Sequence, residues 1–249
     1  MKLIRIFFAK YLVKISNFLP KVSWGLVLIS AYIKGDSESK DFLRRIKRER
    51  SWYKANGDQT YLVDHELSSQ SIVFDVGGYI GNSAASIYCK YGATIHIFEP
   101  VEEYASRLIK RFGGNGKIHI HNYGLGSKTE DLLIYVSEGA TSTFGSRINF
   151  TDRKSIKIQS FAEVLNILKI DEVDLMSINI EGGEYDLLDH IIGNNLLSKI
   201  RCLQIQFHEI DEDSEVHRNN IRSHLRLSHQ ESFCFPFVWE CWVRLDDSI

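Results

Sequence analysis

The sequence predicts an α/β fold of the Rossmann-like type: a mostly parallel, seven-stranded sheet with helices on both faces and a helical N-terminal extension. Two observations lead to this expectation. From residue 71 onward, short apolar runs alternate with segments of helical periodicity, which is the pattern of a parallel sheet with crossover helices. A glycine-rich turn also follows the first apolar run, at the point where open α/β sheets bind their ligands.

The elements follow one another in a regular order. The first strand, 71–76, is an apolar run that leads into glycines, and the second helix, 101–112, ends at a glycine pair. Core strands are expected at 71–76, 94–98, 117–123, 173–180 and 201–209, and helices at 81–91, 101–112, 161–168, 184–192 and 214–229. Further strands are expected at 131–137, as an extension of the sheet, and at 155–159, with a terminal pair at 233–238 and 239–245.

The N-terminal part differs from the rest. We expect residues 1–60 to form a helical, partly amphipathic and basic extension, and residues 61–249 to form the α/β domain. Residues 3–19 place apolar side chains on one helical face and lysines on the other. Such a helix either lies on an anionic membrane surface or packs against protein, in this chain or in a homo-oligomer. The basic run within 36–56 is typical of a solvated helix face; the alternative is a patch that binds phosphate or acid.

Composition excludes several classes. No apolar stretch reaches the roughly 18 residues of a membrane-spanning helix, and lysines interrupt the apolar N-terminus, so a signal peptide is not expected. The formal net charge of −2 gives no indication of a nucleic-acid partner. The four cysteines form no Cys-x-x-Cys pair and no histidine cluster has metal-ligand spacing. We therefore expect reduced, mostly buried thiols, no metal site and a cytoplasmic location, with peripheral contact at the inner membrane face as the alternative.

The first candidate site is the loop at 75–82, which follows a buried strand and opens a helix. Its glycines, Gly77, Gly78 and Gly81, let the backbone turn and approach a ligand closely. The free N–H groups at the helix start, from Asn82 onward, face the same ligand. The alternative is a glycine turn that merely caps the strand.

Two ligand classes fit such a loop. A dinucleotide site requires Gly-x-Gly-x-x-Gly, but Val76 occupies the first glycine position, and only Gly78 and Gly81 match. Asp75 stands just before the glycines, and its carboxylate would repel a diphosphate. It suits a ligand with an ammonium group and no phosphate, such as S-adenosylmethionine.

Glu99, followed by Pro100, ends the second strand 18 residues after Gly81. A carboxylate at this place accepts hydrogen bonds from both ribose hydroxyls of a nucleoside, which NAD sites share. The alternative is an acidic residue that interacts with a helix dipole.

The turn after the third strand offers contacts for a base. Asn122 and Tyr123 could meet the edge of an adenine, with Gly124 and Leu125 packing on its face. Asn and Gly are also common turn residues, so a simple turn is the alternative.

Three residues could handle a proton or the reacting group. Asn179 and Glu181 end the fourth core strand, and burial at a strand end could raise the pKa of Glu181 toward general-base use. His208, at the end of the fifth strand, could accept a hydroxyl proton near neutral pH. A histidine with a purely structural role is the alternative.

Together these segments resemble the FkbM family of S-adenosylmethionine-dependent methyltransferases over roughly residues 70–245. The motifs that carry the resemblance are VFDVGGYIGN (73–82), IFEP (97–100), HNYGLGS (121–127), DLMSINIEGGEYDLL (174–188) and FPFVWECW (235–242). The resemblance implies a class I methyltransferase fold with a reversed final strand, and O-methylation of a sugar or polyketide-type hydroxyl. It implies cofactor contacts at Asp75, Gly77, Gly81 and Glu99, and an acidic loop at 181–182.

The sequence departs from the family pattern at two places. Gly78 and Tyr79 stand where the family usually has Ala-Asn, and Asn179 stands where it usually has Asp. The expected function is O-methylation of a hydroxyl on a surface glycan, its lipid-linked precursor or a similar natural product. The alternatives are a non-catalytic module that binds S-adenosylmethionine and an NAD-dependent oxidoreductase.

Overall fold

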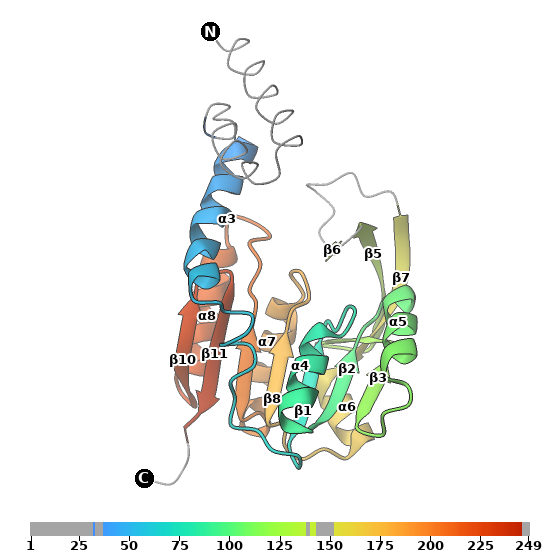
Figure 1. Ribbon diagram of the computed structural model, residues 1–249. Helices are drawn as coiled ribbons and strands as arrows, with labels where there is room; N and C mark the ends of the chain where they lie inside the picture. Colours follow the sequence, from blue (N-terminus) through green and yellow to red (C-terminus); the bar gives the residue numbers. More distant parts are fainter. Residues whose placement is uncertain (1–31, 33–36, 138–139, 143–151, 246–249) are drawn as a thin grey trace. The chain divides into compact units, whose positions relative to one another are not determined.

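The computed structural model describes residues 32, 37–137, 140–142 and 152–245, and the chain divides into two compact units, Met1–Asn56 and Gly57–Ile249 (Figure 1). In the first unit, helix α3 spans Ser37–Lys54, as the sequence predicted for the basic run. The amphipathic segment at 3–19 lies outside the described residues. Among the described helices, none is long and apolar enough to cross a membrane.

The second unit is built on a seven-stranded sheet in the order β10-β11-β9-β8-β1-β2-β3. Its strands are β1 (Ile72–Val76), β2 (Thr94–Phe98), β3 (Ile118–His121), β8 (Leu175–Ile178), β9 (Cys202–Ile205), β10 (His229–Phe235) and β11 (Trp239–Arg244). The five strands from β9 to β3 are parallel, whereas β11 runs antiparallel to both of its neighbours. This order confirms the predicted Rossmann-like sheet and its reversed final strand.

Helices cover both faces of this sheet, as predicted. They are α4 (Asn82–Tyr91), α5 (Glu102–Phe112), α6 (Phe161–Leu168), α7 (Glu184–Gly193) and α8 (Ser214–Leu225). A short 3-10 helix, η1 (Leu196–Lys199), follows α7. Alternate strand residues point to opposite faces, so Val73 belongs to the buried cluster that includes α4 and α5 side chains, while Phe74 belongs to the cluster that includes side chains of the other three helices.

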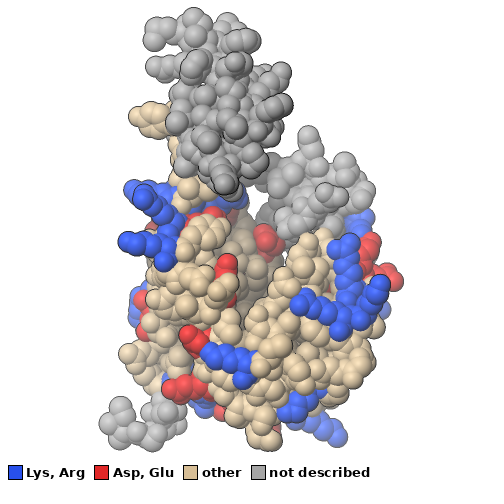
Figure 2. All heavy atoms as spheres, viewed as in Figure 1, with Lys and Arg blue, Asp and Glu red and all other residues tan. Residues whose placement is uncertain are grey.

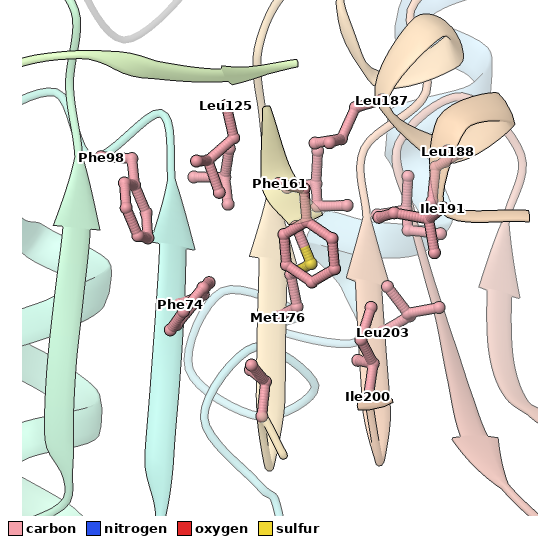
Figure 3. Packing of buried hydrophobic residues seen from close by; sticks show 14 of the residues in the cluster. Phe74, Phe98, Leu125, Phe161, Met176, Leu187, Leu188, Ile191, Ile200 and Leu203 are labelled. Carbon is pink, nitrogen blue, oxygen red and sulfur yellow. The ribbon is translucent and has the colours of Figure 1, made fainter. Parts of the chain in front are cut away.

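The larger core lies on the face that α6, α7 and α8 cover. Figure 3 shows Phe74 and Phe98 on neighbouring strands, with Phe161 of α6 and Met176 of β8 beside them. The Phe74 and Phe98 rings lie 4.9 Å apart between centroids in a tilted arrangement, which is favourable for aromatic pairs. These side chains are essentially free of solvent, so this layer fixes the carboxyl ends of β1, β2 and β8 relative to one another.

A second, four-stranded sheet follows β3 in the order β4-β7-β5-β6. It comprises β4 (Gly124–Gly126), β5 (Glu130–Ser137), β6 (Ala140–Ser142) and β7 (Asp152–Ser160). The strands expected at 131–137 and 155–159 therefore exist, but the first does not extend the main sheet. It pairs antiparallel with β7 in a register from Glu130↔Ile158 to Val136↔Asp152, and this pairing satisfies its backbone groups away from the main sheet.

Three expected strands are shorter by three residues or more in the structure, and the one expected at 173–180 is confined to Leu175–Ile178. The strand expected at 117–123 ends at His121, because the chain turns there and continues as β4 of the small sheet. The strand expected at 201–209 ends at Ile205. The stretch that follows, 206–209, therefore forms a loop at the same edge of the sheet as the glycine loop.

Candidate active site

The carboxyl ends of β1, β2 and β8 open on a cavity of about 240 Å³. Main-sheet residues on its wall include Gly77, Glu99 and Asn179. The small sheet supplies an apolar wall with Leu125, Leu132, Ile134, Ile156 and Ile158. A mostly apolar cavity with a few polar groups is the usual form of a small-molecule site, and it lies where the sequence placed it.

The glycine loop is packed tightly against the neighbouring strands. Gly77 has φ of 88°, and a Cβ there would lie 2.0 Å from the carbonyl oxygen of Asn179. No other residue fits this position without moving β8. An added Cβ at Gly78 or Gly81 would meet Ile97 or α5, so these glycines let the loop pack closely. Neither is among the residues that line the cavity, and their expected contact with a cofactor remains a prediction.

Asn82 does not line the cavity either. Its side-chain oxygen accepts a hydrogen bond from the Arg111 guanidinium at 2.8 Å, which ties the start of α4 to α5. The structure thus gives Asn82 a packing partner, while its expected contact with a cofactor remains a prediction.

Glu99 is nearly fully buried and organises the loop that precedes it. One carboxyl oxygen accepts the backbone N–H of Tyr79 at 2.9 Å, and the other accepts that of Val101 at 2.9 Å. Burial raises the pKa of Glu99 to about 7, although these two hydrogen bonds oppose the rise. Each carboxyl oxygen keeps a lone pair, so Glu99 can accept further hydrogen bonds from hydroxyls in the cavity.

Tyr79, which the sequence marked only as a departure, is held in an unusual conformation. Its φ is 48°, in the left-handed region that side chains other than Gly, Asn and Asp rarely adopt. Its ring meets that of Tyr104 edge-on, with 4.6 Å between the centroids, and both residues line the cavity. Backbone strain of this kind often concentrates at functional sites, and the family's usual Asn would adopt it more easily.

Two buried acceptor atoms beside the glycine loop have no hydrogen-bond partner. They are Oδ2 of Asp75 and Oδ1 of Asn179, on the neighbouring strand ends of β1 and β8. Burial raises the pKa of Asp75 to about 6, with the backbone amide of Ala84 opposing this rise. An unpaired buried acceptor costs about 1–3 kcal/mol, so both atoms suit a ligand that brings N–H donors.

The turn after β3 is only partly directed at the cavity. Gly124 and Leu125 line it, as expected for contacts with a flat base. Asn122 is exposed, and its amide group, oriented to satisfy its hydrogen bonds, donates to the carbonyl oxygens of Glu99 and Pro100 at 3.1 and 3.3 Å. The Tyr123 hydroxyl lies 3.3 Å from Nδ1 of His121. Asn122 and Tyr123 therefore hold the turn, and their expected contact with adenine remains a prediction.

The two candidate bases come together at the ends of β8 and β9. Nε2 of His208 lies 3.5 Å from a carboxyl oxygen of Glu181, and Nδ1 lies 3.1 Å from Oε1 of Glu184. Burial lowers the pKa of His208, but the hydrogen bond and charge of Glu184, together with the charge of Glu181, outweigh this and leave it above its usual value. Glu181 itself has φ of 51° and lines the cavity.

Glu184 is the site residue that sequence reasoning missed. It is fully buried, and its carboxylate accepts the backbone N–H groups of His208 at 2.7 Å and Gly182 at 2.8 Å. It therefore fixes both the loop that carries Glu181 and the ring of His208. The only signal in the sequence was a second glutamate in the EGGE stretch, at the start of a helix.

The model of the family described as Methyltransferase FkbM domain matches residues 75–230, which is more than half of the chain. A search of curated proteins found no match.

Two solved structures illustrate the similarity of this chain to known proteins. The chain is similar to methyltransferase FkbM from Methylobacillus flagellatus KT, with 17% sequence identity and a TM-score of 0.50. That match covers 73% of this chain but only 45% of the other chain. The fibrillarin pre-rRNA processing protein of Methanococcus jannaschii matches with 11% identity and a TM-score of 0.47, over 73% of this chain and 69% of that one. At 17% identity, the similarity to the Methylobacillus flagellatus protein concerns the fold alone.

Proposed function

The chain belongs to the FkbM methyltransferase family and carries its S-adenosylmethionine-dependent domain, and we propose that it methylates a hydroxyl group of a sugar or glycan. The observation that carries this proposal is the pair of unpaired buried acceptors, Asp75 Oδ2 and Asn179 Oδ1, beside a glycine loop and a buried Glu99. These groups suit a nucleoside with an ammonium group better than they suit a diphosphate, which favours a methyltransferase over an NAD-dependent oxidoreductase.

Residues in and beside the cavity would bind the different parts of S-adenosylmethionine. Asn179 and Glu99 line the cavity, whereas Asp75 is buried and is not among its lining residues. Asp75 and Asn179 would hold its ammonium group, and Glu99 would accept the two ribose hydroxyls. Leu125 and the isoleucines of the small sheet would pack on the adenine. When bound, this cofactor supplies a methyl group on a positively charged sulfur, which is reactive toward an oxygen nucleophile.

We propose that the acceptor hydroxyl enters beside Glu181, which lines the cavity, and His208, which lies 3.5 Å from Glu181. We assign His208 as the base that removes the hydroxyl proton at Nε2, with Glu181 beside it to orient the hydroxyl or share the proton. Glu184 is a positioning residue: it accepts from Nδ1 of His208 and thereby directs Nε2 toward Glu181. The arrangement holds the acceptor oxygen in place, and positioning alone can supply much of the rate of such a transfer.

The surface supports a polar, uncharged acceptor rather than a nucleic acid. Over the face of the second unit seen in Figure 2, Lys and Arg side chains are interspersed with Asp and Glu, and the formal net charge is −2. A nucleic-acid site would present a continuous basic stripe. The cavity wall instead includes the carboxylates of Glu130, Glu181 and Asp186, which accept hydrogen bonds from hydroxyl donors.

The basic N-terminal segment, residues 1–35, leads us to propose where the enzyme acts in the cell. If the acceptor is a lipid-linked glycan precursor, residues 1–35 would bring the enzyme to the cytoplasmic membrane surface. Co-sedimentation with anionic vesicles tests this part with the full chain and with a chain that lacks residues 1–35. Pelleting of the full chain alone supports it, and equal, negligible pelleting of both refutes it.

Transfer of a labelled methyl group tests the activity. The protein is incubated with labelled S-adenosylmethionine and fractionated glycans, and label is measured in the glycan. His208→Ala and Glu181→Gln should lower turnover by about 100-fold or more, since general-base groups contribute at least this much. His224→Ala, an exposed histidine at the end of α8, is the matched control. Full activity in both site variants would overturn the assignment, and tight cofactor binding without turnover on any fraction would favour the non-catalytic alternative.

A further inference from the structure

Three potential metal ligands meet in the second unit, away from the cavity. They are His65, in the segment that precedes β1, Cys202 of β9 and Cys241 of β11. The two cysteines lie on adjacent antiparallel strands and are buried, at 5% and 2% exposure. None of the three residues lines the cavity at the carboxyl ends of the strands. The methyl-transfer chemistry therefore leaves this cluster unused.

The distances between the ligand atoms fit a single small cation. The two Sγ atoms lie 3.3 Å apart, and Nδ1 of His65 lies 4.0 Å from Sγ of Cys202. All three atoms fall within 4.8 Å of one another. In a tetrahedral zinc site, bond lengths of about 2.3 Å to sulfur and 2.0–2.1 Å to nitrogen put ligand atoms about 3.5–3.8 Å apart. Small side-chain rotations would bring these atoms to that separation.

The surroundings of His65 match those of a metal-binding histidine. Its Nε2 lies 3.3 Å from the carbonyl oxygen of Leu62, while Nδ1 faces the sulfur atoms. Histidine ligands usually donate their second ring N–H to a carbonyl or carboxylate, which fixes the ring and its tautomer. The amide nitrogen of Gln204 also lies 3.3 Å from Nε2, but both atoms are donors in the metal-binding tautomer, so this nitrogen donates to the Tyr61 carbonyl instead.

The segment that carries His65 is held in place independently of any metal. The Tyr91 hydroxyl of α4 accepts the N–H of His65 at 2.8 Å and donates to the Val63 carbonyl at 2.9 Å. Arg201, next to Cys202, donates to the carbonyl of Glu66. The ring is therefore presented to the two cysteines by fixed backbone on both sides, as a prebuilt site requires.

From this geometry we propose that His65, Cys202 and Cys241 form a binding site for a thiophilic cation, zinc in the first instance, which ties the 57–70 segment to the sheet. Two thiolates and one imidazole are ligands that zinc prefers, and three protein ligands leave a fourth position for water. Binding releases the thiol protons, so the affinity for Zn²⁺ should rise with pH.

The test measures metal binding and does not depend on methyl transfer. The reduced, chelator-treated full chain is titrated with Zn²⁺ against a chromophoric chelator, and Co²⁺ is used as a spectroscopic substitute. One equivalent of Zn²⁺ should bind, and Co²⁺ should give a thiolate-to-metal absorption band. Cys202→Ser and His65→Ala should weaken Zn²⁺ binding by at least about 100-fold, because loss of even an outer partner costs 10–100-fold. Cys89→Ser, at an exposed free cysteine, should change nothing.

A second measurement needs no variant, so it stands even if a substituted chain fails to fold. Thiol alkylation followed by mass spectrometry compares the wild-type protein with and without Zn²⁺. Zn²⁺ should slow the labelling of Cys202 and Cys241 at least tenfold and leave that of Cys89 unchanged. Equal labelling with and without Zn²⁺, or equal Zn²⁺ binding by wild type and Cys202→Ser, would overturn the proposal and leave a buried thiol pair with a packing role.

Discussion

Replacing Asp75 with asparagine should make the free protein more stable and its cofactor binding weaker. Asp75 is buried, its Oδ2 has no partner, and burial raises its pKa from 3.8 to about 6. The folded state therefore holds its proton more tightly than the unfolded state does. As the pH rises from about 4 to 6, the unfolded chain releases this proton first, so the free energy of unfolding falls through this window and stays low above it.

The size of the effect follows from the two pKa values. The pKa of Asp75 is roughly two units higher in the folded state than in the unfolded state. This difference lowers the free energy of unfolding by about 3 kcal/mol at pH 8, and by about half of that at pH 5. Asparagine keeps the shape of the side chain without a charge to desolvate. Asp75→Asn should therefore unfold in urea with a free energy higher by as much as about 3 kcal/mol at pH 8, and by less at pH 5.

The same substitution should weaken S-adenosylmethionine binding about 10- to 100-fold, because hydrogen bonds to a charged group contribute about 1.5–3 kcal/mol. Urea unfolding and calorimetric titration of one preparation measure both effects. Asp171→Asn, at an exposed position between α6 and β8, should change neither quantity. If Asp75→Asn lowers stability at pH 8 and leaves cofactor affinity unchanged, then Asp75 is a structural residue and the site has been misplaced.

Three further substitutions test other parts of the account. Glu99→Gln should weaken cofactor binding about 10- to 100-fold in calorimetry, while Glu102→Gln, an exposed neighbour on α5, should not. Glu184→Gln removes the charge that raises the pKa of His208. NMR should therefore show that His208 titrates at lower pH, and the acid limb of the pH profile of kcat should shift in the same direction. An unchanged pKa of His208 would argue against Glu184 as a positioning residue. Lys169, at the C-terminal end of α6, has a left-handed backbone (φ 55°) that glycine adopts without strain. Lys169→Gly should therefore raise the free energy of unfolding by about 1 kcal/mol and the Tm by about 2–4 °C in a thermal scan. A lower Tm would contradict the strain argument.

Local patterns predicted the parts of this fold that depend on neighbouring residues. The apolar runs and helical periodicity placed the core strands and α6 correctly, because each buries its own face against the sheet. The loop at 75–82 was recognisable because Gly77 meets a backbone constraint that only glycine satisfies. Strand ends were less predictable, since β9 stops where its partner β8 stops and not where its apolar residues do.

Contacts between distant residues could not be read from the sequence. Glu184 holds His208 across 24 positions, and nothing local indicates that a carboxylate at a helix start will be fully buried. His65 and Cys202 are 137 positions apart, so spacing rules for metal sites could not find them, and the expectation of no metal site rested on spacing alone. The Asn122 amide donates to the carbonyls of Glu99 and Pro100 for a similar reason, because those acceptors come from the loop that follows β2.

We propose that the carboxyl ends of β1, β2 and β8 bind S-adenosylmethionine through Asp75 and Glu99. Calorimetric titration of the purified chain with S-adenosylmethionine, and separately with NAD, tests this most directly. We expect micromolar binding of S-adenosylmethionine, lost in Glu99→Ala, and no binding of NAD. Binding of NAD in its place, or binding of S-adenosylmethionine that survives Glu99→Ala unchanged, would contradict this account of the site.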